Sequence, residues 1–119
     1  MYQQNIVLCG ANAYTKKYYL NDDFGMLPEG VQAELKIMCV LYTEDVGGVL
    51  TLKFEEEGTL IFETSAKEED LLFDEIGSAL KIKQMQKTKA DMLRSLELFF
   101  KVFFLEEDIE EITSEKIDV

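Results

Sequence analysis

The sequence contains no histidine, and this absence removes the side chain that most often acts as a general base or a metal ligand. Catalytic pairs of serine or cysteine with histidine are excluded for the same reason. Glycine-rich phosphate loops of the GxGxxG and GxxxxGK types are missing as well. We therefore predict no cofactor and no catalytic or metal-binding residues, and a non-enzymatic role is favoured over an enzymatic one.

Cysteine is scarce, since only Cys9 and Cys39 occur, which is too few for a disulfide scaffold. Each lies in an apolar run without a cationic neighbour, so both are predicted to be reduced, buried and unreactive. No apolar run approaches the roughly 18 residues of a membrane span, and the first residues lack the basic start of a signal peptide. These features predict a cytoplasmic protein.

Basic residues are few, at 12 against 24 acidic ones, and the formal net charge is −12. Such a charge repels nucleic acid and anionic lipid, so neither is expected as a partner. The segment from Lys81 to Arg94 departs from this pattern, because it contains several basic residues and a single acidic one. Lys83, Lys87 and Arg94 share a helical stripe there, which is either a solvated face or a contact surface for an acidic partner.

Carboxylates gather in short clusters, so acid–base chemistry or weak binding of Mg²⁺ or Ca²⁺ stays an alternative. The clusters lie in predicted loops, at a hairpin tip and at helix starts, where acids are common for structural reasons. The alternative function is an enzyme or small-molecule sensor with a pocket of carboxylates and tyrosines. Its candidate lining residues are Tyr14, Tyr18, Tyr19 and Tyr42.

Alternation of apolar and polar residues predicts two β-hairpins. The strands of the first are residues 5–9 and 14–20, with a turn at Gly10-Ala11-Asn12. The strands of the second are VLTLKF and TLIFET, where Gly58 supplies the positive φ of a short connection.

Helical spacing of apolar residues begins after Pro28 and continues to Val46, and Gly47-Gly48 ends it. Its segment IMCVLY is apolar on every side, so a second helix or another subunit is expected to cover it. From about Asp70 to Leu105 the sequence is compatible with helix, with an interruption considered at Gly77.

The predicted fold is therefore α+β: a small antiparallel sheet with helices on one face, in the order β-β-α-β-β-α, ending in a long C-terminal helix. One domain is expected to span residues 1–105. Residues 106–119 are strongly acidic and are expected to form a mobile tail.

An apolar cluster near residue 100 covers most of a helix circumference, and its members are Leu98, Phe99, Phe100, Val102, Phe103 and Phe104. Phe99 and Phe103 share one face, which we assign to the core. Phe100 and Phe104 are rotated by about 100° from that face, so they are assigned to an interface between two copies of the chain. Packing of this second pair against the helix of residues 31–46 is the alternative that needs no dimer.

Three segments, VLCGANAYTKKYYLNDDF, ELKIMCVLYTEDVGGVLTLKF and DEIGSALKIKQMQ, followed by SLELFFKVFF, resemble a family of small uncharacterised Firmicutes proteins. The resemblance covers about residues 2–105, and the family has only a domain-of-unknown-function label. It implies a bacterial cytoplasmic setting and no particular activity. The sequence as a whole favours a homodimeric protein-interaction module that binds another protein.

Overall fold

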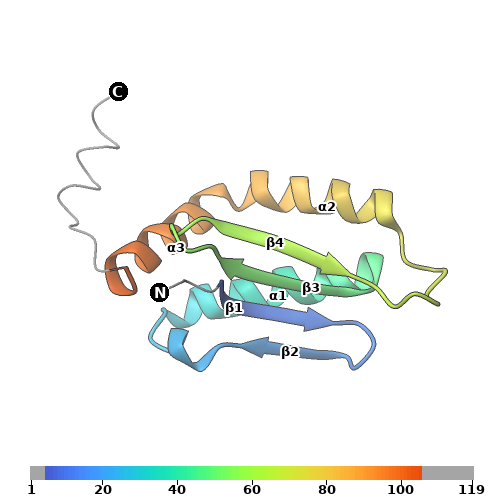
Figure 1. Cartoon of the computed structure of the whole chain (residues 1–119), viewed down its shortest axis with the longest axis horizontal. Helices are drawn as coiled ribbons and strands as arrows, with labels where there is room; N and C mark the ends of the chain where they lie inside the picture. The colour runs from blue at the N-terminus through green and yellow to red at the C-terminus, as the bar shows by residue number, and fades with distance from the viewer. Residues whose placement is uncertain (1–4, 106–119) are drawn as a thin grey trace.

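The computed structural model describes residues 5–105, which form a four-stranded antiparallel sheet with helices packed on it (Figure 1). The strand order is β2-β1-β3-β4. The predicted α+β fold, with helices on one face, is confirmed. The expected mobile tail lies outside the described residues. In chain order the elements are β1 (Ile6–Asn12), β2 (Lys17–Leu20), the 3₁₀ helix η1 (Asp22–Phe24), α1 (Glu29–Val46), β3 (Val49–Phe54), β4 (Leu60–Ser65), α2 (Glu75–Thr88) and α3 (Ala90–Phe103).

The turn of the first hairpin differs from the sequence prediction. Gly10 lies within β1, where a Cβ atom would come to 3.0 Å from the carbonyl oxygen of Leu50. The chain reverses after Asn12 instead, because the Asn12 side chain accepts hydrogen bonds from the backbone amides of Tyr14 (2.8 Å) and Thr15 (3.2 Å). The predicted glycine therefore serves close strand packing rather than the turn.

One face of the sheet forms the core. Leu50, Leu52 and Phe54 alternate along β3, and all three are fully buried. A β-bulge between Val7 and Cys9 lets Leu8 and Cys9 both turn inward. Helix α1 lies against this face, behind the strands in Figure 1. The strongest alternation in the sequence thus specifies the face that the helix covers.

The apolar surface of α1 is only partly covered by a second helix. Tyr42 of α1 is fully buried, and its hydroxyl lies 2.5 Å from the hydroxyl of Ser78 of α2. On the outer side of α1, Ile37 and Leu41 keep 57% and 49% of their surface exposed. The expected second layer is therefore α2, and it leaves part of the helix uncovered.

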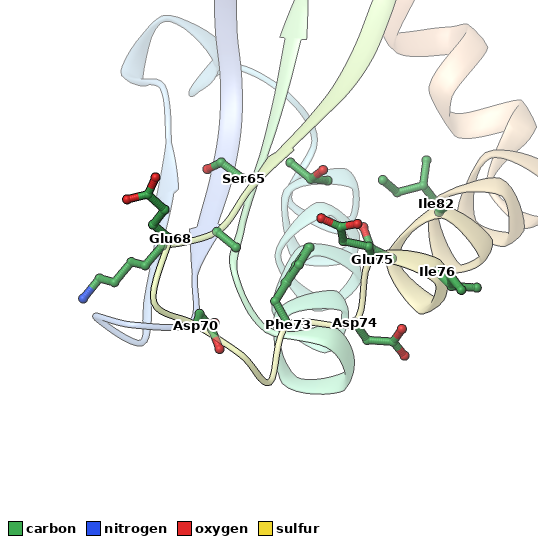
Figure 2. A pocket seen from close by; sticks show the side chains of 13 residues that line it. Ser65, Glu68, Asp70, Phe73, Asp74, Glu75, Ile76 and Ile82 are labelled. Carbon is green, nitrogen blue, oxygen red and sulfur yellow. The ribbon is translucent and has the colours of Figure 1, made fainter.

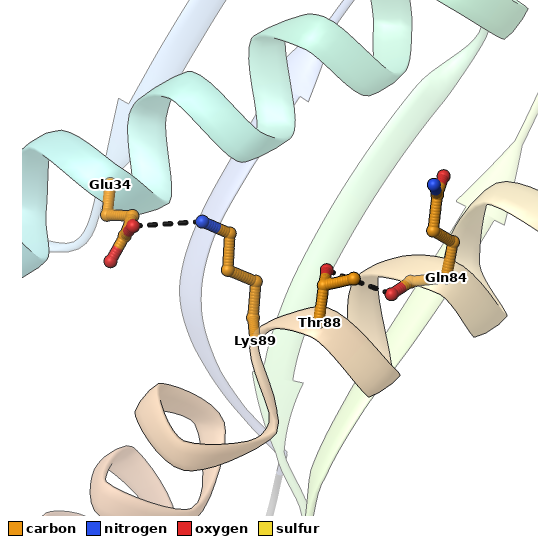
Figure 3. Close-up of polar contacts among 4 residues, drawn as sticks. All are labelled: Glu34, Gln84, Thr88 and Lys89. Carbon is orange, nitrogen blue, oxygen red and sulfur yellow. Dashed lines mark hydrogen bonds and ion pairs between the residues drawn. The ribbon is translucent and has the colours of Figure 1, made fainter.

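The C-terminal helical region is two helices, and the break falls at Lys89 rather than at Gly77. Gly77 lies in the first turn of α2, where its amide donates to the capping carboxylate of Asp74 at 2.8 Å. At the break, the Lys89 ammonium reaches Glu34 of α1 at 2.9 Å, and the Thr88 hydroxyl donates to the Gln84 carbonyl (Figure 3). Among residues 5–105, no helix has the length and apolarity needed to cross a membrane.

The break changes which phenylalanines face the core. Phe100 is 1% exposed and stacks on Phe54 with ring centroids 4.3 Å apart, whereas Phe103 is 64% exposed. The assignment of Phe103 to the core is therefore wrong. Phe104 stacks on Phe24 of η1 with ring centroids 4.8 Å apart, so the apolar surface that covers Phe104 belongs to the same chain. The spacing of apolar residues in the sequence continues across Lys89 as if α2 and α3 were one helix. Because Lys89 separates the two helices, α3 has a different rotation about its axis and buries Phe100 rather than Phe103.

Candidate functional site

An open groove of about 940 Å³ lies between β4 and α2 (Figure 2). Residues 64–66 form its strand side. One stripe of α2 forms the opposite side, with Ile76, Ala79 and Ile82 as its apolar members. The groove therefore follows the end of an edge strand.

Strand β4 is the last strand on its side of the sheet, and part of its outer edge has no partner within the described residues. The Leu60 amide points away from β3, because it donates to the Glu97 carboxylate at 2.8 Å. Since backbone groups alternate along a strand, the amides and carbonyls of Phe62 and Thr64 point the same way. Within the described part of the chain neither residue has a backbone hydrogen bond on that side. Glu97 thus caps one end of the edge and leaves the groove end open.

The loop between β4 and α2 is held to the first hairpin by Tyr14. The Tyr14 hydroxyl donates to the Asp70 carboxylate at 2.5 Å and accepts from the Lys67 amide at 3.0 Å. The Lys67 ammonium lies 4.7 Å from the centre of the tyrosine ring. The hydrogen bond from Tyr14 lowers the pKa of Asp70, and the same bond raises the pKa of Tyr14. These contacts give the loop a defined position beside the groove.

The loop also packs against the end of α1 through Phe73. A Cβ atom on Gly48 would lie 2.7 Å from the Phe73 ring and 2.6 Å from the Ser65 carbonyl oxygen. Gly48 has φ +72°, a conformation that favours glycine. Glycine at this position therefore permits the close approach that places Phe73 in the groove wall.

The rim of the groove is acidic and its surroundings are apolar. Four acids, Glu68, Asp70, Asp74 and Glu75, line it against the single cation Lys67. Nearby, Leu71, Leu72 and Ile76 keep 92%, 93% and 75% of their surface exposed. Large apolar side chains exposed together are typical of surfaces that bind a partner.

The residues predicted to form an interface lie on α2, on α3 and directly after α3. Lys83 and Lys87 are exposed on α2, and exposed Arg94 of α3 lies 3.5 Å from Asp91. Phe100 and Phe104 pack within the chain, as described above, so Phe100 presents almost no area to another copy. Whether two copies associate stays a prediction.

The four candidate tyrosines do not converge on one pocket of the described chain. Tyr42 is buried beside Ser78, Tyr19 is exposed, and Tyr14 binds Asp70. Burial raises the pKa of Tyr18, whose buried hydroxyl has no hydrogen-bond partner among residues 5–105. Among the same residues, no group of three or more cysteine or carboxylate side chains is placed to hold a metal ion.

Cys9 and Cys39 are both fully buried, as predicted, and their sulfur atoms lie 3.9 Å apart. Hydrogen bonding to Cys9 and burial raise the pKa of the Cys39 thiol. A raised pKa disfavours the thiolate, which is the nucleophilic form. Their predicted lack of reactivity stays a prediction.

The sequence did not reveal the open edge of β4. The alternation in TLIFET predicts a strand, but pairing partners depend on the strand order, which local patterns do not specify. The one usable signal was the cluster of loop acids together with the apolar pair Leu71-Leu72.

Comparison with known proteins supports the resemblance to a family of unknown function, over residues 5–108 rather than 2–105, and the Firmicutes origin stays a prediction. No curated protein and no solved structure matches the chain. A family model described as a family of unknown function (DUF6145) matches residues 5–108, which include the whole sheet, all three α-helices and the groove. The chain therefore belongs to this family of unknown function, DUF6145.

Proposed function

We propose that the protein is a non-enzymatic interaction module that binds an extended, cationic segment of a partner protein along the open edge of β4. The observation that carries the proposal is the outward-facing backbone of Phe62 and Thr64 beside the groove, which has no partner among residues 5–105. An extended peptide that adds to a sheet edge gains main-chain hydrogen bonds, and pockets beside the edge select its side chains.

The two ends of the β4 edge are treated differently, which supports this proposal. Exposed edges promote unwanted association, and proteins commonly block them. The Glu97 carboxylate blocks the edge at Leu60, while no described residue does so at Thr64. We expect such an arrangement, in which the edge of β4 is blocked at one end and open at the other, in a protein that binds one specific strand.

The charge of the groove selects the chemistry of the partner. Its four acids and one lysine favour a segment rich in lysine or arginine, and the formal net charge of −12 attracts cations at longer range. Exposed Ile76, together with Ile82 in the groove wall, favours apolar residues at alternate positions of the bound strand. A second copy of this acidic chain fits the groove poorly.

Cytoplasmic location and homodimerisation are further parts of the proposal. Two free, buried cysteines fit a reducing compartment. Exposed Phe103 on α3 is the large apolar side chain that a second copy would cover.

The test is binding of a decapeptide of alternating lysine and valine, measured by titration calorimetry. Reversing two rim charges with Glu68→Lys and Glu75→Lys should weaken binding by about tenfold, since two lost charge contacts of about 0.7 kcal/mol each amount to the roughly 1.4 kcal/mol of a tenfold change. The matched control is Glu56→Lys with Glu57→Lys, which changes the net charge equally at the opposite end of β4. Equal weakening by both pairs, or no binding of the peptide, would contradict the proposal.

A further inference from the structure

A second hollow, of about 630 Å³, lies between the first hairpin and α1, on the side of the molecule away from the β4 edge. Ala11 and Tyr18 contribute its strand side, and Val40 and Thr43 contribute its helix side. Its volume falls within the range of small-molecule sites. Its walls are mainly apolar and include the ring of Tyr18, which can pack against a flat or apolar body.

The lining of this hollow carries positive charge. Lys16 and Lys17 of the hairpin and Lys36 of α1 line it, and Glu44 is the single acid of the lining. All three lysines are exposed, and none forms an ion pair within residues 5–105. The lining therefore carries three cations against one acid, in a chain whose formal net charge is −12.

Among residues 5–105, Lys67, Lys83, Lys87 and Lys101 also form no ion pair, so what distinguishes the three lysines of the hollow is that they line one hollow together. Lys53, Lys81 and Lys89 each pair with an acid, at distances between 2.7 and 3.1 Å. With twice as many acids as bases in the sequence, an ammonium group has many carboxylates available to it. Neighbouring like charges repel one another, and a bound anion relieves that repulsion while it gains three attractive contacts.

We infer that this hollow binds a small organic anion that carries two or more negative charges beside an apolar or aromatic body. Phosphate and carboxylate groups share this chemistry, because both accept hydrogen bonds from ammonium groups. The inference concerns a different part of the molecule from the proposed peptide groove, so either can fail without the other.

The test compares four probes by titration calorimetry and by amide chemical shifts. Tripolyphosphate carries the charge without the body, adenosine carries the body without the charge, ATP carries both, and citrate replaces phosphate with carboxylate. ATP should bind most tightly, tripolyphosphate more weakly, and adenosine should not bind detectably. Binding of citrate as well as tripolyphosphate would show that charge rather than phosphate geometry is recognised, while selective binding would assign the site to one of the two groups.

Variants locate the site. Lys17→Glu with Lys36→Glu should weaken ATP binding by at least about tenfold, since two ammonium contacts to the anion become repulsive. The control Lys83→Glu with Lys87→Glu changes the net charge equally on an exposed face of α2 and should leave binding within about twofold. Thermal unfolding of both variants verifies that they remain folded. Binding of adenosine as tight as that of ATP, equal weakening by both variants, or no binding of any polyanion would overturn the inference.

Discussion

Replacing Phe100 with alanine should destabilise the protein far more than the same change at Phe103. Phe100 is 1% exposed and stacks on Phe54 at 4.3 Å and on Phe104 at 5.1 Å. Removing a buried phenylalanine leaves a cavity and typically costs about 3–5 kcal/mol of unfolding free energy. Phe103 keeps 64% of its surface exposed, so it loses only about a third of the roughly 1.5–3 kcal/mol that full burial contributes.

The assay is urea unfolding followed by far-ultraviolet circular dichroism, because the sequence has no tryptophan to report by fluorescence. With a slope of about 1–2 kcal/mol per molar urea, the midpoint should fall by roughly 1.5–5 M for Phe100→Ala and by no more than about 1 M for Phe103→Ala. Phe100→Leu, which leaves a smaller cavity, provides a measurable variant if the alanine protein does not fold. Equal losses at the two positions, or a larger loss at Phe103, would refute the orientation of α3 described above.

Four further predictions concern other parts of the fold. Gly48→Ala should cost about 1–3 kcal/mol more in urea unfolding than Gly47→Ala, because both residues have positive φ but only Gly48 has close neighbours, the Phe73 ring and the Ser65 carbonyl; equal losses would contradict this. Cys39→Ser should destabilise the fold by roughly 1–3 kcal/mol, and neither buried thiol should react rapidly with a thiol reagent under native conditions, so rapid labelling would show that the site is accessible. Folding favours the ionised form of Asp70, because the pKa of Asp70 is lowered in the folded protein. The wild type should therefore be more stable than Tyr14→Phe above the ordinary carboxyl pKa of 3.8, and this difference in stability should shrink as the pH falls through the lower folded pKa. A difference in stability that does not change with pH in that range would exclude the Tyr14–Asp70 bond as its source. If α3 forms a dimer interface, light scattering should give a dimer for the wild type and a folded monomer for Phe103→Ser, whereas a wild-type monomer at high micromolar concentration would exclude the dimer.

The sequence predicted the parts of the fold that depend on local patterns. Alternation identified both strands of the second hairpin, and Gly47-Gly48 marked the end of α1 correctly. The first turn was misplaced because an asparagine side chain can organise a turn as well as a glycine can, and Asn12 does so here. The predicted buried face of α3 was wrong, because the spacing of apolar residues in one helix does not determine the rotation of the helix that follows a break. The break here is at Lys89.

The candidate sites depend on contacts between distant residues, which local patterns do not contain. The edge position of β4 follows from the strand order, and the contact of Tyr14 with Asp70 joins residues 56 positions apart. Lys36 lines the same hollow as Lys16 and Lys17 only because α1 lies beside the hairpin. A helical stripe was visible at Lys83 and Lys87, but the cation cluster that lines a hollow was not.

The proposed strand addition to β4 is tested most directly by amide hydrogen exchange, measured by nuclear magnetic resonance with and without the alternating lysine–valine peptide. The amides of Phe62 and Thr64 point away from β3, so the bound strand should slow their exchange. The amides of Ile61 and Glu63 point toward β3 and should change little, which makes them internal controls. Saturating peptide that leaves the exchange of Phe62 and Thr64 unchanged would contradict the proposal.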